Sequence, residues 1–119
     1  MSEAKEAKEK RVIERYIDAM LAGDWMALAD CFEPRCTYFD FCPIGTNMQN
    51  YHVYGKEAVE MFFNNKFFFK TVVIYDPVIE TDTKANYLVA YAGQNLHVQA
   101  TIDKISENGL IEIMVIRPA

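Results

Sequence analysis

The sequence lacks any cluster of basic residues after its first fifteen positions, and in that first segment Lys and Arg alternate with Glu. The formal net charge is −5, from 12 Lys and Arg against 17 Asp and Glu. Proteins that bind nucleic acids neutralise phosphates with a basic surface, which this composition does not provide. We therefore expect no nucleic-acid partner.

Long hydrophobic runs are also missing. No apolar stretch approaches the roughly 20 residues that a membrane-spanning helix needs. The first residues, MSEAKEAKEK, lack the apolar core of a signal peptide. With 51% hydrophobic and 24% charged residues, the chain has the composition of a globular protein. The sequence predicts a soluble, cytoplasmic protein with no membrane partner, in which residues 1–119 form a single domain.

Cysteine is scarce. Only Cys31, Cys36 and Cys42 are present, and an odd number argues against a framework of disulfides. Their spacing fits no zinc pattern, and neither histidine lies at a ligand spacing from them. The sequence predicts buried, reduced thiols, with no metal site and no cofactor.

Three helices are expected. Residues 3–22 carry apolar side chains on one helical face, and Gly23 ends this helix. Asp24 is a suitable N-cap for a second, short helix over 25–32. A third helix is predicted over 56–65. The apolar face of the first helix consists of Val12, Ile13, Tyr16, Ile17, Met20 and Leu21.

Most of the remaining chain has the composition of β-strands. These are predicted over residues 36–41, 67–80, 85–92, 95–106 and 110–117, with a loop over 42–55. Helices followed by a run of strands favour an α+β fold, with a curved antiparallel sheet wrapped around three N-terminal helices. Such an arrangement leaves a hollow between sheet and helices that suits a small hydrophobic ligand.

The segment CTYFDF places Asp40 inside an aromatic run that favours a strand. Asp is depleted in strands and is costly to bury without a partner. Asp40 could face solvent, form a turn at the end of the strand, or be a carboxylate held in an apolar pocket for chemistry.

Asp103 raises the same question in the segment NLHVQATIDKI. Strand alternation places His97, Gln99, Thr101 and Asp103 on one face, and Leu96, Val98, Ala100 and Ile102 on the other. Asp103 could belong to a solvated polar face or point into the hollow. Tyr16, on the apolar stripe of the first helix, is either a core tyrosine or one whose hydroxyl meets a partner in that hollow.

Three segments together resemble a known family. ERYIDAMLAGD, CTYFDFCPIG and ATIDKISENGLIEIMVI are similar, in order and spacing, to the ketosteroid isomerase branch of the nuclear-transport-factor-2-like (NTF2-like, SnoaL-like) superfamily. The resemblance covers nearly the whole chain and implies the cystatin-like, NTF2-like cone as its fold.

The resemblance also implies an activity and three catalytic residues. Asp40 takes the place of the catalytic base, and Tyr16 and a protonated Asp103 take the places of the two oxyanion-hole donors. The implied reaction is a cofactor-independent double-bond isomerisation of a small apolar carbonyl compound. A non-catalytic ligand-binding or dimerisation module, or a related cyclase or dehydratase, is the alternative.

An inward-facing Asp103 has two further consequences. The apolar face of the same strand, Leu96 to Ile102, would then point outward and need a cover, so a homodimer packed through its sheets is expected. The residues expected to bind the substrate are Met20, Phe62, Gln99, Thr101, Met114 and Ile116.

Overall fold

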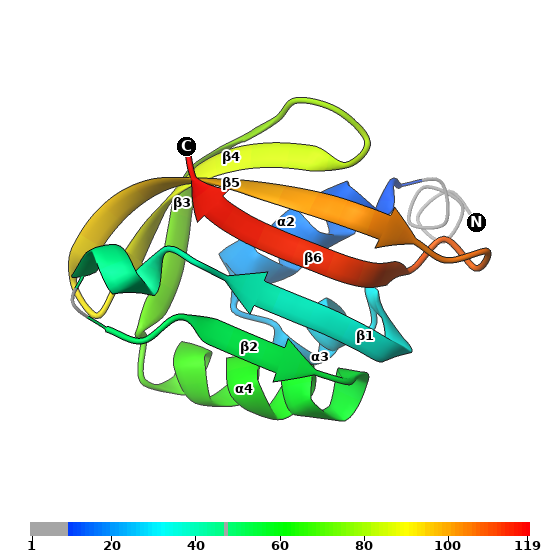
Figure 1. The fold of residues 1–119 in the computed structure, drawn as a ribbon, viewed down its shortest axis with the longest axis horizontal. Coiled ribbons are helices and arrows are strands. Elements are labelled where there is room, and N and C mark those ends of the chain that lie inside the picture. The colour runs from blue at the N-terminus through cyan, green and yellow to red at the C-terminus, as the bar shows by residue number, and fades with distance from the viewer. Residues whose placement is uncertain (1–9, 47) are drawn as a thin grey trace.

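The computed structural model of the chain describes residues 10–46 and 48–119, and within them an α+β fold (Figure 1). Its helices are α2 (Val12–Ala22), α3 (Trp25–Ala29) and α4 (Lys56–Phe68), with a 3-10 helix η1 (Pro43–Thr46). Its strands are β1 (Phe32–Asp40), β2 (Tyr51–Tyr54), β3 (Val72–Ile79), β4 (Lys84–Tyr91), β5 (Gln94–Ile105) and β6 (Ile111–Pro118). The predicted fold class is confirmed.

The strands form one six-stranded sheet in the order β2-β1-β6-β5-β4-β3. Neighbouring strands are antiparallel except for β1 and β6, which are parallel. The sheet is therefore mixed, and the prediction of a purely antiparallel sheet is wrong for this pair. Side-chain alternation predicts a strand and its two faces, but carries no information on the direction of a neighbour that is distant in sequence.

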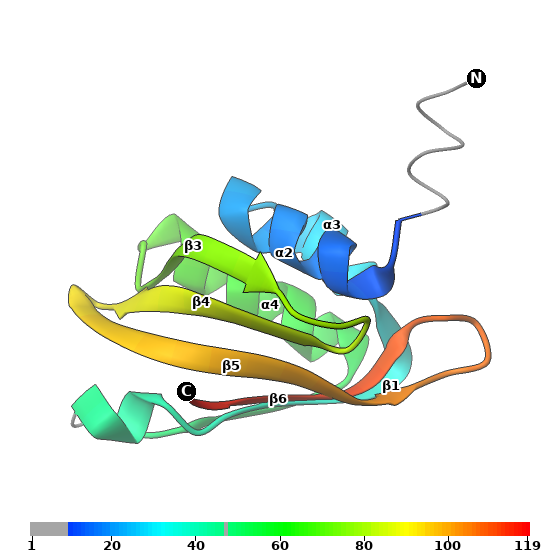
Figure 2. The same cartoon turned by 90° about the horizontal axis from the view of Figure 1, so that it is seen from above.

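All three described helices cover one face of the curved sheet, as Figure 2 shows. Only α2 and α3 are N-terminal, because α4 follows the β1–β2 hairpin. The prediction of three N-terminal helices is wrong in this respect, since it treated the segment before α4 as one short strand and a loop. The hairpin now forms the edge of the sheet against which α4 packs.

The boundary between α2 and α3 follows the sequence closely. Gly23 adopts a left-handed φ of 65° and its N–H bonds back to Met20, which ends α2. The Asp24 carboxylate accepts a 3.0 Å hydrogen bond from the Ala27 N–H and caps α3. However, α3 ends at Ala29 and Phe32 already belongs to β1, so the predicted helix over 25–32 is too long.

Strand β2 lies inside the predicted loop. Its four residues, Tyr-His-Val-Tyr, alternate between buried and exposed positions and pair with β1, so that Tyr51 stands opposite Asp40. Such a short alternating segment, surrounded by Asn, Gly and Gln, is a weak signal on its own. This strand brings an additional tyrosine to the Asp40 side chain.

Helix α4 extends to Phe68, three residues beyond the predicted end at 65. The run of three phenylalanines favoured a strand, but Phe63 and Phe67 lie one helical turn apart and their rings pack at 5.4 Å. The irregularity expected at Pro77 is present, because the β3–β4 register shifts between Tyr75 and Val78.

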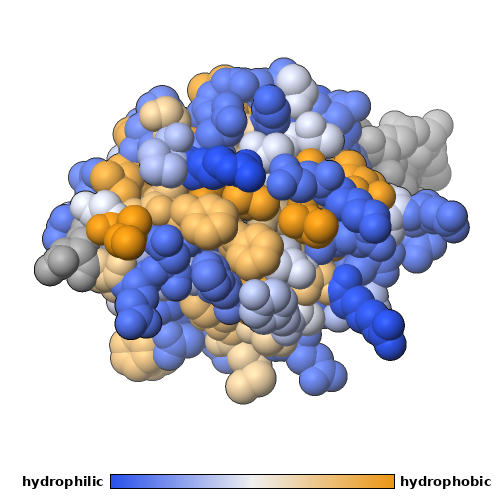
Figure 3. All heavy atoms as spheres, viewed as in Figure 1, coloured by the Kyte–Doolittle hydropathy of each residue, from blue (hydrophilic) through white to orange (hydrophobic). Residues whose placement is uncertain are grey.

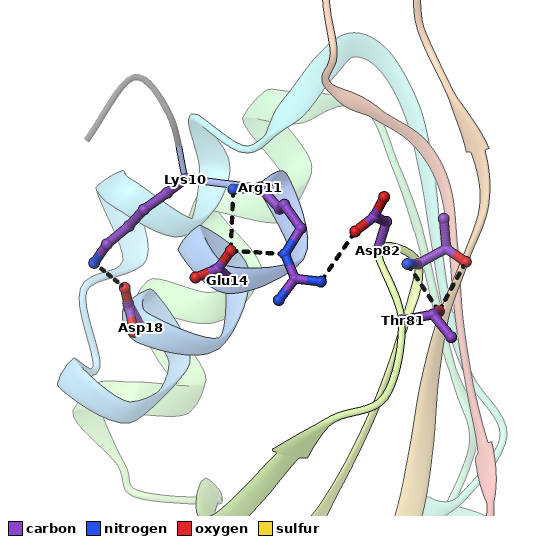
Figure 4. Close-up of polar contacts among 7 residues, drawn as sticks. Lys10, Arg11, Glu14, Asp18, Thr81 and Asp82 are labelled. Carbon is purple, nitrogen blue, oxygen red and sulfur yellow. Dashed lines mark hydrogen bonds and ion pairs between the residues drawn. The ribbon is translucent and has the colours of Figure 1, made fainter. Parts of the chain in front are cut away.

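The N-terminus of α2 is tied to the β3–β4 turn by Arg11. Its Nε lies 2.7 Å from Glu14 Oε1 and its Nη1 lies 3.0 Å from Asp82 Oδ1 (Figure 4). These groups are accessible to solvent, so each ion pair contributes little to stability. Their effect is to fix the start of α2 beside the sheet.

The apolar face of β5 packs into the core. Val98, Ala100 and Ile102 are buried, whereas His97 and Asp103 are exposed. The prediction that the apolar face points outward is therefore wrong, and these residues give no reason to expect a dimer. The physical reason is the larger gain from burying the aliphatic row, which outweighs any gain from turning four polar residues inward.

Candidate functional site

Asp40 is the only polar or charged residue that is buried among the described residues, with 2% of its surface exposed. It lies at the end of β1, between buried Tyr38 and buried Cys42 in the inward-facing row. The Tyr91 hydroxyl donates to Asp40 Oδ2 at 2.6 Å, and the Cys42 N–H donates to Oδ1 at 2.9 Å. No ion pair to Asp40 is present within residues 10–46 and 48–119.

This environment changes the protonation of Asp40. Burial raises the pKa of its carboxyl group, and the hydrogen bonds from Tyr91 and Cys42 only partly oppose the rise. Burial, together with the carboxylate, also raises the pKa of Tyr91, so the phenol remains the donor in this pair. A carboxylate with a raised pKa in an apolar site is suited to accept a proton near neutral pH.

Tyr51 supplies the free hydrogen-bonding group of the site. Its hydroxyl is enclosed, yet it has no hydrogen-bond partner in the described part of the chain. Its ring lies 4.8 Å from that of Phe62 and 6.3 Å from that of Tyr91. Burial and then the charge of Asp40 raise the pKa of Tyr51. An enclosed hydroxyl without a partner costs free energy, so a ligand oxygen that forms a hydrogen bond with Tyr51 would be bound favourably.

Helix α4 forms the outer wall of this site. Lys66 Nζ lies 4.9 Å from the centre of the Tyr51 ring and 5.2 Å from that of Phe62, within the range of a cation–π contact. Phe62 and Lys66 are half-buried, whereas Tyr51 beneath them is 9% exposed. Movement of these two side chains would open the site to solvent.

Tyr16 is fully buried, as expected for the inner face of α2. Its hydroxyl lies 2.9 Å from that of Tyr87 on β4, and either oxygen can be the donor. Burial raises the pKa of Tyr16, although hydrogen bonds to Tyr87 and Tyr38 oppose this rise. The structure thus places Tyr16 and Asp40 in one aromatic core, while the partner of Tyr16 is Tyr87.

Asp103 lies on the other side of the sheet. Its side chain is 39% exposed, and Oδ2 is 3.8 Å from Arg117 Nη2 on the outer face. The β5–β6 register shifts between Ile102 and Lys104, which leaves Asp103 at a bulge. Asp103 cannot reach the interior from this position, so the predicted oxyanion hole of Tyr16 with Asp103 is not formed.

The predicted substrate-binding residues separate into two groups. Gln99 and Thr101 are half-buried on the outer face with Asp103, so their inward placement is wrong. Met20, Met114 and Ile116 are buried in the core, and Phe62 contacts Tyr51. Of these six residues, Phe62 meets the site through its ring contact with Tyr51, and Ile116 stands beside Asp40 in the β1–β6 register.

Sequence reasoning missed Tyr51 and Tyr91. Tyr91 had a usable signal, because Ala85, Tyr87, Val89 and Tyr91 occupy alternate positions of β4 and are all buried. Tyr51 had no comparable signal, because the strand that holds it is only four residues long.

Aromatic side chains fill the interior around Asp40. Five hollows on the described surface, of 360 to 650 Å³, are lined by other residues.

The described residues contain no group of three or more His, Cys, Asp or Glu side chains placed to hold a metal ion. All three cysteines are buried and free, and burial together with Asp40 raises the pKa of Cys42 to about 12. None of the described helices has the length and hydropathy to cross a membrane.

Comparison with known proteins identifies the fold. No protein-family model and no curated protein matches the sequence. Among solved structures, the chain is similar to an NTF2-like protein of unknown function from Cytophaga hutchinsonii, with a TM-score of 0.59 and 14% identity. The match covers 91% of this chain and 87% of that protein. The chain therefore has the NTF2-like fold, and this similarity extends to the fold alone.

Proposed function

We propose that the chain catalyses a cofactor-independent proton transfer on a small, mainly apolar carbonyl compound, with Asp40 as the base. The observation that carries this proposal is a buried carboxyl group held by Tyr91 and the Cys42 N–H, beside the hydroxyl of Tyr51. In the described part of the chain, the carboxyl group has no cationic partner and the hydroxyl has no hydrogen-bond partner. Burying a carboxylate in this way is expensive for stability, and such groups concentrate at functional sites.

Tyr51 takes the role that the resemblance to ketosteroid isomerases gave to Asp103. Loss of a proton next to a carbonyl group develops negative charge on the oxygen, which needs a donor in a dry site. Tyr91 already donates to the base and Tyr16 is paired with Tyr87. Tyr51 is thus the hydroxyl available for the substrate, and Tyr91 positions Asp40.

The reaction we favour remains a double-bond isomerisation, in which one base removes a proton and returns it elsewhere. A single carboxylate and a nearby phenol are sufficient for this chemistry. The aromatic surroundings, with Phe62 over Tyr51, suit a substrate that is apolar around its carbonyl group.

The direct test uses the unmodified protein with a β,γ-unsaturated ketone and, separately, with a phenol that mimics the enolate. We expect conversion to the conjugated ketone, observed by its ultraviolet absorption, and saturable binding of the phenol that quenches tyrosine or tryptophan fluorescence. If the protein neither converts any ketone nor binds any phenol in a panel of such compounds, the proposed reaction is ruled out.

A non-catalytic dimerisation module is the second candidate, and a different surface favours it. Four rings form an outer aromatic patch, consisting of Phe39 at the end of β1, Phe41 just after that strand, and His52 and Tyr54 on β2. Figure 3 shows apolar side chains gathered across this face. Exposed apolar patches mark interaction sites, and a two-fold axis would let this patch cover itself in a homodimer.

Phe41→Glu is expected to convert this homodimer into a monomer, because it places a charge in the outer aromatic patch. Sedimentation velocity at micromolar concentration measures the change, with Phe68→Glu on α4 as the matched control. The unmodified protein sedimenting as a monomer would contradict the homodimer.

A further inference from the structure

Helices α2 and α3 border a solvent-open hollow of about 420 Å³ that is separate from Asp40. Ala19, Ala22 and Ala27 form its apolar wall, and Cys31 and Arg15 also line it. The volume lies within the range of small-molecule sites. Small side chains on facing helices leave this space open.

The acidic groups that line the hollow already have partners. Asp18 Oδ2 lies 2.9 Å from Lys10 Nζ, a pair drawn in Figure 4. Asp30 Oδ1 lies 3.1 Å from Lys56 Nζ, and Asp24 accepts the capping bond from Ala27. None of them is bonded to Arg15.

Arg15 differs from the acidic groups of the hollow because its guanidinium has no partner among the described residues. Its Nε is enclosed from solvent without a hydrogen-bond partner, and its guanidinium makes no ion pair within the described ranges 10–46 and 48–119. A guanidinium has five donors, and leaving a buried donor unpaired costs free energy. Arg15 also lines a second hollow of about 360 Å³, beside Asn108 and Gly109 of the β5–β6 turn.

We propose that the hollow between α2 and α3 binds a small aliphatic monocarboxylate. Its two oxygens would pair with the guanidinium of Arg15, whose fork matches a carboxylate, and its chain would lie along the alanine wall. The nearby carboxylates of Asp18, Asp24 and Asp30 oppose any anion, and they oppose a doubly charged phosphate more strongly than a monocarboxylate. The ion pairs of Asp18 with Lys10 and of Asp30 with Lys56 offset part of this repulsion. An apolar wall with one unpaired guanidinium thus selects a single negative charge on a short apolar body.

The test is a titration of the whole protein with hexanoate, followed by heteronuclear NMR shifts of the α2 and α3 amides. We expect saturable binding, with hexanol and inorganic phosphate at least tenfold weaker. Arg15→Gln should weaken hexanoate binding by at least tenfold. Arg117→Gln, which removes an exposed arginine from the outer face, should leave it unchanged.

A second variant keeps the proposal testable if Arg15→Gln folds poorly. Ala27→Leu retains Arg15 and fills the apolar wall, so it should weaken hexanoate by at least tenfold but leave acetate binding within about twofold. Three results would each overturn the assignment. The first is hexanoate binding by Arg15→Gln that equals binding by the unmodified protein. The others are a loss of hexanoate binding in Arg117→Gln as large as that in Arg15→Gln, and a preference of the unmodified protein for phosphate over hexanoate. Loss of hexanoate binding in Tyr51→Phe, which lacks the hydroxyl proposed to meet the substrate oxygen, would place the carboxylate at the proposed catalytic site instead.

Discussion

Asp40→Asn should lower the rate of ketone isomerisation by roughly 10²–10⁴-fold, the usual contribution of a positioned general base. The amide keeps the volume of the side chain, and its oxygen can still accept from Tyr91, but it cannot accept a proton. Binding of the phenol should survive, because Tyr51 keeps its hydroxyl. Steady-state rates and phenol titrations on the same preparations measure the two effects.

The pH dependence adds a second readout. Burial raises the pKa of Asp40, and the base acts only when ionised. Activity should therefore increase as the pH rises through this raised pKa, and it should be lost at pH values below that pKa. Asp40→Asn should abolish this limb of the profile. A variant with normal rate and an unchanged profile would exclude Asp40 as the base.

Two further variants separate the site from general damage to the fold. Tyr51→Phe removes the proposed donor and should weaken the phenol and slow the reaction, by roughly 2–4 kcal/mol in the transition state if it acts like other oxyanion-hole donors. Asp103→Asn should change neither, because Asp103 is on the outer face. A large loss in Asp103→Asn with an unchanged Tyr51→Phe would reverse this assignment.

Phe63→Ala should lower the free energy of unfolding by about 3–5 kcal/mol, the usual cost of removing a large side chain from a core. Phe63 is fully buried, and its ring lies 5.1 Å from Tyr38, 5.0 Å from Phe62 and 5.4 Å from Phe67. Because small domains have only about 5–15 kcal/mol in total, such a loss leaves the variant near its unfolding threshold.

Urea denaturation followed by circular dichroism measures this loss. Phe68→Ala, on the same helix but 76% exposed, is the matched control and should change stability by less than about 0.5 kcal/mol. Equal effects of the two substitutions would contradict the packing described for α4.

Local signals in the sequence predicted a large part of the fold. Gly23 and Asp24 identify the α2–α3 boundary because their conformational preferences act within a few residues. Strand β2 was missed because four alternating residues are a weak signal. The parallel β1–β6 pair was missed because it joins segments that are distant in sequence. Period-two alternation located the two faces of β5 but did not state which one meets the helices.

The same limits apply to the candidate site. Asp40 is identifiable from sequence because a carboxylate in an aromatic strand is unusual. Its neighbour Tyr51 comes from the short strand β2, which pairs with β1. Tyr91 ends β4, which β6 and β5 separate from β1, so its hydroxyl reaches Asp40 only across the folded sheet. Asp103 had a similar sequence context but the opposite orientation, since the aliphatic residues beside it determine which side is buried.

The central position of β6 has a consequence for synthesis on the ribosome. This strand joins the β1–β2 hairpin to the β3–β4–β5 meander, although it is the last of the six described strands to be made. Until it emerges, the nascent chain holds two sheet fragments, each with an exposed hydrogen-bonding edge that can pair wrongly. Folding of the domain is thus delayed until translation has passed β6, and chaperones that shield strand edges would act during that interval.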